Sequence, residues 1–170
     1  YAYIASVLPD HLGTSANGRV IVAHLGNGAS MCAMRQRKSV ATSMGFTALD
    51  GLVMGRRCGT LDPGVILYLM QSKGMTAAQV ETLLYRESGL LGVSGISNSM
   101  QDLEASNAPQ AREAIDLFVA RAARTLAGMI PAISGLDAVV FTAGIGENSA
   151  PVRAAICAQL DWLGLQLDPK

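Results

Sequence analysis

The stretch that most constrains this chain is I-V-A-H-L-G-N-G-A-S, residues 21–30, where a glycine turn joins two apolar runs. Apolar runs on either side of such a turn are typical of a hairpin of two largely buried strands, which we expect over residues 19–35. Gly26 and Gly28 have no Cβ, so the turn backbone can take positive φ and admit an anion to its N–H groups. His24, at the strand end, is either a hydrogen-bond donor to that anion or a structural histidine.

The composition excludes several classes of function. Basic and acidic residues each number 13 among 170, so no basic field exists to attract nucleic acid or an anionic membrane. Half of the residues are hydrophobic and 15% are charged, which indicates one domain with part of its surface covered by another domain or subunit. The apolar stretch 128–146 is broken by polar residues and Pro131, so it is no membrane span. Cys32, Cys58 and Cys157 lack metal-ligand spacing and are expected to be reduced cytoplasmic thiols.

The remaining pattern alternates helices and strands. In the first half we expect a helix over residues 1–8 stopped by Pro9, a turn at 10–15 and a strand at 40–43. Two helices follow, one from Asp62-Pro63 to about Ser72 and one with a capping box at Thr76. In the second half we expect a long helix opened by Pro109, a strand at 137–142, a helix opened by Pro151 and the start of a strand at 165–167. Within the glycine- and serine-rich stretch 88–99, the apolar residues Leu90, Leu91, Val93 and Ile96 are expected to be buried.

Residues 45–64, here named the arginine loop, are rich in glycine and have no apolar period. A loop of this length inside a compact domain is usually functional or disordered. Its apolar residues, such as Leu52 and Met54, argue for an ordered loop that presents Arg56 and Arg57. Either both arginines point to solvent, or one reaches a phosphate or a carboxylate, for which the planar guanidinium is suited.

A second glycine turn, A-G-I-G-E-N at residues 143–148, follows the strand predicted at 137–142. A strand, a glycine turn and a helix N-terminus form an arrangement that binds phosphate, because free N–H groups and the helix dipole favour an anion there. It is neither a Walker loop nor a full dinucleotide fingerprint, and a plain strand-to-helix turn stays open. With the hairpin turn and the arginine loop it indicates an α/β domain that holds a phosphorylated ligand. The sequence shows no Ser-His-Asp order and no His/Cys metal cluster, which disfavours nucleophilic and zinc chemistry.

Four motifs in order carry a resemblance to a known family: H-L-G-N-G at 24–28, M-G-x-R-x-G-x-L-D-P-G at 54–64, S-G-I-S at 94–97 and F-T-A-G-I-G-E-N at 141–148. They resemble the acetate kinase family, which has propionate and butyrate kinases as relatives. The resemblance implies the ribonuclease H-like, actin-like ATPase fold of sugar kinases, Hsp70 and actin, with a mixed sheet flanked by helices. It also implies that residues 1–170 are a single domain, most of the second, nucleotide-binding domain, with the first domain absent.

The resemblance further implies a set of site residues. His24 and Arg57 would be catalytic, His24 contacting the transferring phosphoryl group and Arg57 stabilising the transition state. The residues implied to bind the nucleotide are His24, Leu25, Gly26, Asn27 and Gly28 at the phosphates, and Ser99, Met100, Gln101, Gly144, Ile145, Gly146, Glu147 and Asn148 toward the adenosine. The implied reaction is ATP plus acetate giving ADP plus acetyl phosphate. Mg²⁺ would come with the nucleotide, with no protein metal ligand in this chain, and the protein would be a homodimer.

The chain also departs from the family pattern. Ser99-Met100-Gln101 stands where the family usually carries Asp-x-Arg, so an altered nucleotide preference is expected. A phosphate loop, a substrate-binding arginine and a catalytic aspartate of the first domain, a second histidine and a magnesium-binding glutamate are not in residues 1–170, so the chain alone is expected to be inactive. The alternatives are a propionate or butyrate kinase, a non-catalytic nucleotide-binding or assembly module of the same fold, and a degenerate relative.

Overall fold

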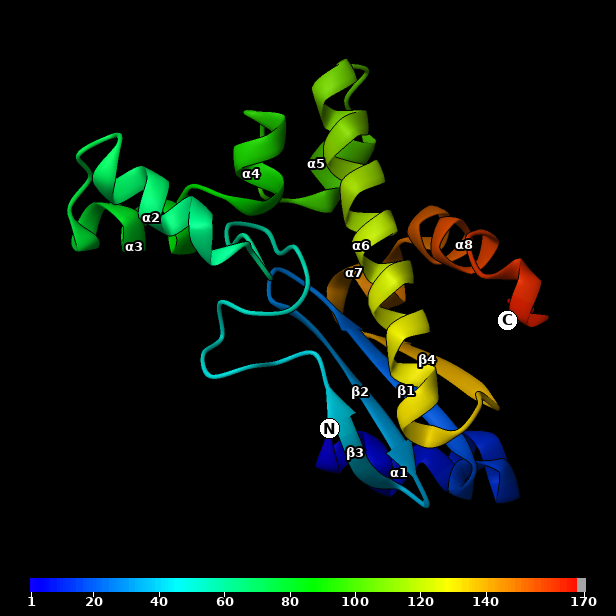
Figure 1. Ribbon diagram of the computed structural model, residues 1–170. Coiled ribbons are helices and arrows are strands. Elements are labelled where there is room, and N and C mark those ends of the chain that lie inside the picture. The colour runs from blue at the N-terminus through cyan, green and yellow to red at the C-terminus, as the bar shows by residue number, and fades with distance from the viewer. Residues whose placement is uncertain (168–170) are drawn as a thin grey trace.

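The computed structural model describes residues 1–167 and is built around a four-stranded mixed sheet of order β3-β2-β1-β4 (Figure 1). Strands β1 (Arg19–Leu25), β2 (Ala29–Arg35) and β3 (Lys38–Thr42) are antiparallel neighbours, whereas β4 (Ala138–Thr142) lies parallel to β1. The predicted hairpin and the predicted α/β class with a mixed sheet flanked by helices are confirmed.

Helices cover both faces of this sheet (Figure 1). Ile21 and Ala23 of β1 belong to the main core, with Phe118 and Leu126 of the long helix α6 (Pro109–Ile133). The alternate residues of β1 belong to a second cluster with Leu8 of α1 (Ala2–Leu12). A central strand buried on both faces reads as a continuous apolar run, which explains the sequence of β1.

The other helices connect and flank these layers. They are α2 (Pro63–Gln71), α3 (Ala77–Arg86), α4 (Gly89–Ser94), α5 (Met100–Glu104), α7 (Ala143–Asn148) and α8 (Ala150–Ala158), with short 3-10 helices at Gly13–Asn17 and Asp161–Leu163. The Asp62 cap of α2 and the Thr76–Gln79 capping box of α3 form as predicted. None of the helices formed by residues 1–167 has both the length and the apolar character needed to cross a bilayer. Cys32, Cys58 and Cys157 are free thiols.

The prediction that Pro9 ends the first helix is wrong, because Pro9 lies inside α1. A proline removes the hydrogen bond of its own nitrogen, but the chain can continue past it when its neighbours keep helical geometry. Gly13, with φ +55°, ends the helix, and its N–H donates to the Pro9 carbonyl. The turn expected at residues 10–15 is therefore the last turn of α1 and the following 3-10 helix.

The expectation that Ile96 is buried is also wrong, since this side chain is 45% exposed. The stretch 88–99 contains the short helix α4, which directs Leu90 into the core. Gly95, with φ +64°, ends α4, and Ile96 lies beyond its last turn. Leu91 and Val93 are partly buried.

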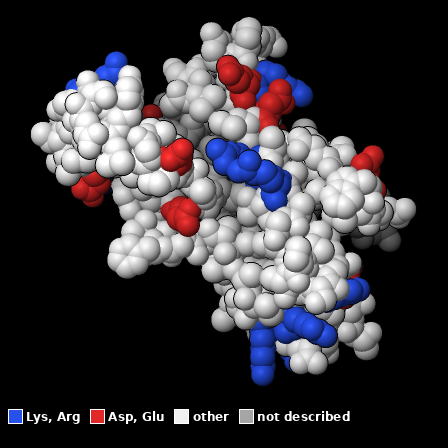
Figure 2. Space-filling model, in the orientation of Figure 1, with Lys and Arg blue, Asp and Glu red and all other residues white. Residues whose placement is uncertain are grey.

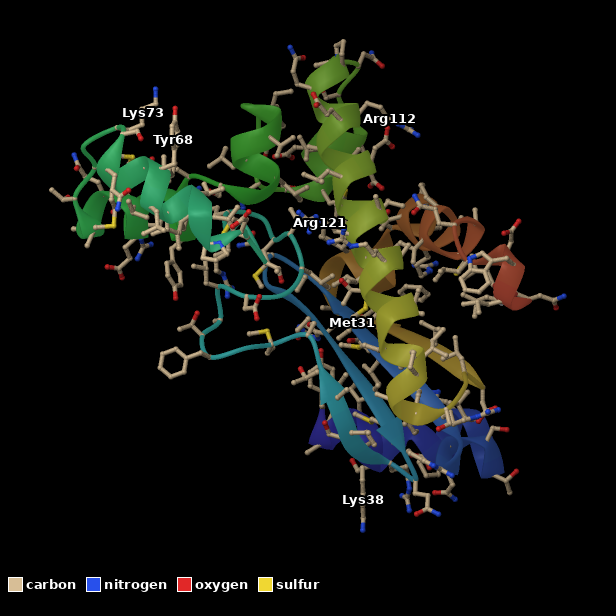
Figure 3. All side chains as sticks on the ribbon, in the orientation of Figure 1. Met31, Lys38, Tyr68, Lys73, Arg112 and Arg121 are labelled. Atoms are coloured by element: carbon tan, nitrogen blue, oxygen red, sulfur yellow. The ribbon has the colours of Figure 1, made fainter. Side chains whose placement is uncertain are left out.

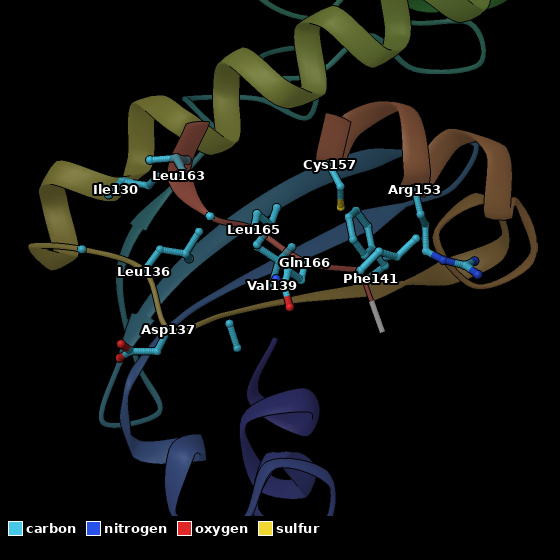
Figure 4. A pocket seen from close by; sticks show the side chains of 14 residues that line it. Ile130, Leu136, Asp137, Val139, Phe141, Arg153, Cys157, Leu163, Leu165 and Gln166 are labelled. Atoms are coloured by element: carbon cyan, nitrogen blue, oxygen red, sulfur yellow. The ribbon is translucent and has the colours of Figure 1, made fainter. Parts of the chain in front are cut away.

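The strand that residues 165–167 were expected to begin does not form. β4 is an edge strand of the sheet, and Leu165, Gln166 and Leu167 face its Val139 and Phe141 across a cavity of about 480 Å³ (Figure 4). A strand exists only where its N–H and C=O groups pair with a neighbouring strand. Residues 165–167 make no such ladder with β4.

Candidate functional site

One cavity of about 760 Å³ brings together three segments that are far apart in the sequence. Its lining residues are Gly26 and Asn27 from the hairpin turn, Asn98–Gln101 and Glu104 from the start and end of α5, and Gly144, Ile145, Asn148 and Ser149 from α7 and its end. Parts of both predicted glycine turns and the segment 99–101 therefore line one cavity. The predicted binding residues that do not line it are His24, Leu25, Gly28, Gly146 and Glu147.

The sheet explains why these segments meet. β1 and β4 are parallel neighbours, so the segments that follow them leave the same edge, where ligands of α/β proteins commonly bind. His24 pairs with Thr142 in the register, and a Cβ on Gly26 would lie 3.4 Å from the Cβ of Ala143. Gly146 is buried, and a Cβ there would lie 3.6 Å from the carbonyl oxygen of Ala23. His24 and Gly146 thus lie at the same end of the sheet.

The arginine loop lies against the hairpin turn. Its backbone N–H at Gly55 donates to the carbonyl of Asn27 at 2.9 Å. A Cβ on Gly28 would lie 2.8 Å from Nη2 of Arg57, so the absence of a side chain at Gly28 leaves room for the guanidinium. Nη1 of Arg57 donates to the Ala48 carbonyl at 2.5 Å. Arg57 is half-buried and is held beside the turn. It does not line the cavity of about 760 Å³ but a neighbouring one of about 350 Å³, together with Glu81, Thr82, Tyr85 and Arg86.

His24 is exposed at the end of β1, where its Nδ1 and the Thr142 hydroxyl are hydrogen-bonded at 3.1 Å. When the hydroxyl donates to Nδ1, the proton resides on Nε2, which then faces outward as a donor. Leu25, the next residue, has its side chain fully buried in the core. Only the backbone of Leu25 can face a ligand.

The residues at 99–101 differ in what they offer to the cavity. The Ser99 hydroxyl accepts from the N–H of Asp102 at 3.4 Å and caps α5. Met100 is 4% exposed and packs in the core. Gln101 is exposed and lines the cavity, so its amide is the side-chain group of this segment that is free to meet a ligand.

Residues 143–148 form the helix α7 instead of the expected open glycine turn. A Glu147 carboxylate oxygen accepts from the N–H of Ala143 at 2.9 Å, and the Asn148 amide donates to the Gly144 carbonyl at 2.8 Å. One N–H of the predicted phosphate-binding turn, that of Ala143, is therefore satisfied within the chain. Ala143 has φ +67°, which is uncommon for a residue with a side chain and marks local backbone strain.

Sequence reasoning missed three residues that line the cavity: Asn98, Glu104 and Ser149. Ser149 caps α8 and its hydroxyl donates to the carboxylate of Glu104, which joins α5 to α8. A serine two residues before Pro151 is a signal for the start of a helix, which could have pointed to Ser149. Nothing in the sequence marks Asn98 or Glu104. Among residues 1–167, no group of three or more His, Cys, Asp or Glu side chains is placed to hold a metal ion.

Comparison with known proteins identifies the family. The sequence pattern of the acetokinase family matches residues 1–170. An acetate kinase of Rhodopseudomonas palustris (strain TIE-1) is 62% identical over 99% of this chain and 43% of its own length. The crystal structure of Porphyromonas gingivalis acetate kinase is 34% identical with a TM-score of 0.93, over 98% of this chain and 43% of that one. A propionate kinase structure from Francisella tularensis is 40% identical with a TM-score of 0.91, over 98% and 44%. This chain therefore belongs to the acetokinase family.

Proposed function

We propose that the full-length protein carrying this chain is an acetate kinase, which transfers the γ-phosphoryl group of ATP to acetate and gives ADP and acetyl phosphate, reversibly. The chain spans about 43% of the length of the Rhodopseudomonas relative, so the activity belongs to the longer protein. This part contributes the nucleotide cavity, His24 and Arg57. The observation that carries the proposal is the contact between the hairpin turn, which lines the cavity, and the half-buried Arg57.

The residues present suit a nucleotide. The cavity volume of about 760 Å³ lies within the range of small-molecule sites, and the amides of Gln101 and Asn148 line it. The base and ribose would lie between α5 and α7, and the phosphates would extend to the turn at Gly26–Gly28. Mg²⁺ bound to the phosphates would neutralise part of their charge.

In the reaction an oxygen of acetate bonds to the γ-phosphorus, and the bond from that phosphorus to the β,γ-bridging oxygen breaks, so ADP leaves. Such transfers ask the protein mainly to position the groups and to stabilise charge on the equatorial oxygens. Arg57 supplies a planar cation beside the turn. The ring of His24 is oriented by its hydrogen bond with Thr142, and with the hydroxyl as the donor to Nδ1, His24 would offer a donor at Nε2.

The test is Arg57→Ala in the full-length protein, with acyl phosphate trapped by hydroxylamine. We expect kcat to fall at least about 10³-fold, as for other arginines that stabilise this kind of transition state. The Kd for ADP should change only a few-fold, because the interaction develops in the transition state. Arg124→Ala, on the exposed side of α6, is the matched control. An equal loss in kcat and in nucleotide affinity would instead favour a non-catalytic binding module.

Propionate is the second candidate substrate, because the Francisella protein named a propionate kinase is 40% identical to this chain. Acetate and propionate differ by one methylene, which contributes about 1–3 kcal/mol to discrimination in an apolar pocket. A panel of carboxylic acids of increasing chain length, compared by kcat/KM, separates the two. A maximum at propionate would replace acetate in the proposal.

The nucleotide preference is proposed to be altered relative to relatives that carry Asp-x-Arg at residues 99–101. Ser99 is engaged in a helix cap and Met100 is in the core, so the neutral Gln101 would be the side chain of this segment that meets the nucleotide. We expect kcat/KM values for ATP, GTP and ITP to differ from the ratios of a relative with the full motif. Identical ratios would contradict this.

We also propose a homodimer whose interface includes α2. This helix has no charged residue and no buried residue, although Leu67 is 55% exposed and Tyr68 50%. Helices that are apolar all round are normally covered. The lobe of α2 and α3 projects from the sheet, and its surface is largely white (Figures 1 and 2). The side chains of Tyr68 and Lys73 project from the upper side of this lobe (Figure 3). An uncharged surface meets a second copy without repulsion, so Leu67→Lys should yield monomers by sedimentation. An unchanged dimer would exclude this surface.

The isolated 170-residue chain is proposed to form no acyl phosphate, since the family's first domain supplies other groups of the site. The full-length protein is proposed to act in the cytoplasm. Detectable turnover by the purified chain would refute the first statement, and cell fractionation tests the second.

A further inference from the structure

We propose that Asn98 is a positioning residue, which fixes the arginine loop relative to the hairpin turn so that Arg57 contacts the phosphoryl group. Its amide nitrogen donates to Oδ1 of Asn27 at 3.1 Å, and its Oδ1 accepts from Nη2 of Arg56 at 3.4 Å. One side chain therefore connects three segments: the wall of the cavity, the turn and the loop. This inference rests on the proposed function and adds a residue to it.

The contact that Asn98 bridges leaves little free space. A Cβ on Gly55 would lie 1.8 Å from Oδ1 of Asn27 and 2.9 Å from the carbonyl oxygen of Asn98. Gly55 is buried, and its N–H donates to the Asn27 carbonyl. The backbone of the arginine loop thus lies directly against both asparagines. A shift of Asn27 or Asn98 must move the loop two residues before Arg57.

The turn contacts Arg57 at a second point. Gly28 approaches the guanidinium so closely that a Cβ there would lie 2.8 Å from Nη2. Asn27 and Gly28 are adjacent, so the position of the turn relative to the loop also sets the position of the guanidinium. The turn thus contacts the arginine loop at Asn27, against Gly55, and at Gly28, against Arg57. Asn98 fixes the first of these two contacts through its hydrogen bond to Asn27.

Asn98 itself is held by polar contacts on its own segment. The Ser97 hydroxyl donates to a carboxylate oxygen of Asp102 at 2.6 Å and accepts from the N–H of Ser99 at 3.1 Å. Ser99 in turn caps α5. The backbone on both sides of Asn98 is therefore fixed to the helix, and its side chain can serve as a rigid link.

Loss of this link should affect catalysis more than folding. The bonds of Asn98 lie at an exposed rim, where a single hydrogen bond contributes little to stability. Rates depend more steeply on placement, and a displacement of about 1 Å can cost on the order of 10²-fold. An error in the position of Arg57 would appear in kcat, because that contact develops in the transition state.

The experiment is a double-mutant cycle in the full-length protein. Asn98→Ala should lower kcat about 10- to 100-fold with a KM for ATP within about threefold of the parent. In a background of Arg57→Ala, the same substitution should lower kcat less than threefold, because both act through one group. Full additivity of the two losses would overturn the proposal.

Two further variants separate hydrogen bonding from packing. Asn98→Leu keeps the number and branching of the side-chain heavy atoms but removes the hydrogen bonds, and it should lose as much rate as Asn98→Ala. Asn98→Asp should retain most of kcat at saturating ATP, because its carboxylate accepts from Arg56 and, after a rotation of the Asn27 amide, from Asn27. Its charge near the phosphates should raise the KM for ATP. Full activity of Asn98→Leu would overturn the proposal. This test remains valid even when Asn98→Ala does not fold. Asn107→Ala, on the exposed loop before α6, is the matched control.

The outcomes also separate this inference from the proposed function. If Arg57→Ala leaves acyl phosphate formation unchanged, Arg57 is not catalytic. The catalytic role of Arg57 and the positioning role of Asn98 are then both refuted. If Arg57→Ala abolishes the rate while Asn98→Ala has the parent kcat, the function stands and the positioning role of Asn98 alone is refuted.

Discussion

Two glycine-containing segments follow neighbouring strands of one sheet, yet they fold differently. After β1 the chain makes a short turn closed by the Gly26 N–H and the Gly28 carbonyl at 3.1 Å, and the space beside Gly28 is taken by Arg57. After β4 the chain winds into α7, where a Cβ on Gly144 would meet nothing within 4 Å. Glycine is required for close approach in the first segment. In the second it leaves one wall of the cavity open.

This contrast predicts unequal effects for the same substitution at the two segments. Gly28→Ala should lower kcat of the full-length protein about 10- to 100-fold, because the new Cβ would lie 2.8 Å from Arg57 Nη2 and must displace it. Stopped assays of acyl phosphate at saturating ATP measure the effect. Gly128→Ala, in α6 with nothing within 4 Å, is the matched control and should keep the parent kcat. A parent-like kcat for Gly28→Ala would mean that Arg57 does not depend on the turn.

The closed form of the second segment depends on side chains that bond back to its own backbone. Asn148→Ala removes the bond from its amide to the Gly144 carbonyl and should loosen α7. Loss of about 1 kcal/mol corresponds to about a fivefold rise in the KM for ATP, with kcat little changed. Isothermal titration with ADP provides the direct measurement. A fall in kcat as large as that of Gly28→Ala would remove the distinction between the segments.

Gly144→Ala should have the smallest kinetic effect of the three. The added methyl meets no protein atom within 4 Å but lies at the wall of the nucleotide cavity, so we expect an unchanged kcat and a rise in the KM for ATP of no more than about twofold. Steady-state kinetics on this variant and Gly28→Ala, prepared side by side, compare the two directly. A large loss in this variant would indicate that the nucleotide contacts the backbone at Gly144 more closely than proposed.

The sequence predicted what local patterns determine. The β1–β2 hairpin, the Asp62 and Thr76 caps and the buried face of α6 follow from periodicity and capping, which act over a few residues. The candidate site was harder to predict from the sequence. The local pattern indicated an ordered loop that presents Arg56 and Arg57, and only the family resemblance distinguished Arg57. The contact of Arg57 with Gly28 joins residues 29 positions apart, and the link from Asn98 to Asn27 spans 71. Such contacts depend on the assembled fold. The same is true of the helix cap formed by Ser99 and of the burial of Met100 in the core.

The α7 segment shows why a glycine motif alone was misleading. Two glycines within six residues indicate a turn, since glycine is unfavourable inside a helix. The bonds from Glu147 and Asn148 to the backbone compensate and close one helical turn. These two hydrogen bonds can form only when β4 places residues 143–148 in the right position, and the local sequence does not determine that position.

The opposite end of the sheet should respond in stability and not in kinetics. Asp137, just before β4, accepts from the backbone N–H and the guanidinium of Arg19, and this holds the pKa of Asp137 at about 2. A carboxyl whose pKa is lower in the folded state stabilises the fold above its unfolded value, near 3.8. That contribution is lost as the pH falls from about 4 to about 2. Asp137→Asn should therefore lower the Tm at pH 6, and the difference from the parent should shrink toward pH 2.

Thermal melts across that pH range test this prediction, with kcat at pH 7 as the second readout. Asp161→Asn is the control, because Asp161 is exposed and forms no ion pair within the described part of the chain. We expect Asp137→Asn to keep the parent kcat, since Arg19 and Asp137 stand at the start of β1 and β4 while the cavity lies beyond their carboxyl ends. A fall in kcat without a change in Tm would show that the two ends of the sheet are coupled, and the kinetic effects at Gly28 and Asn148 could then not be assigned to local contacts.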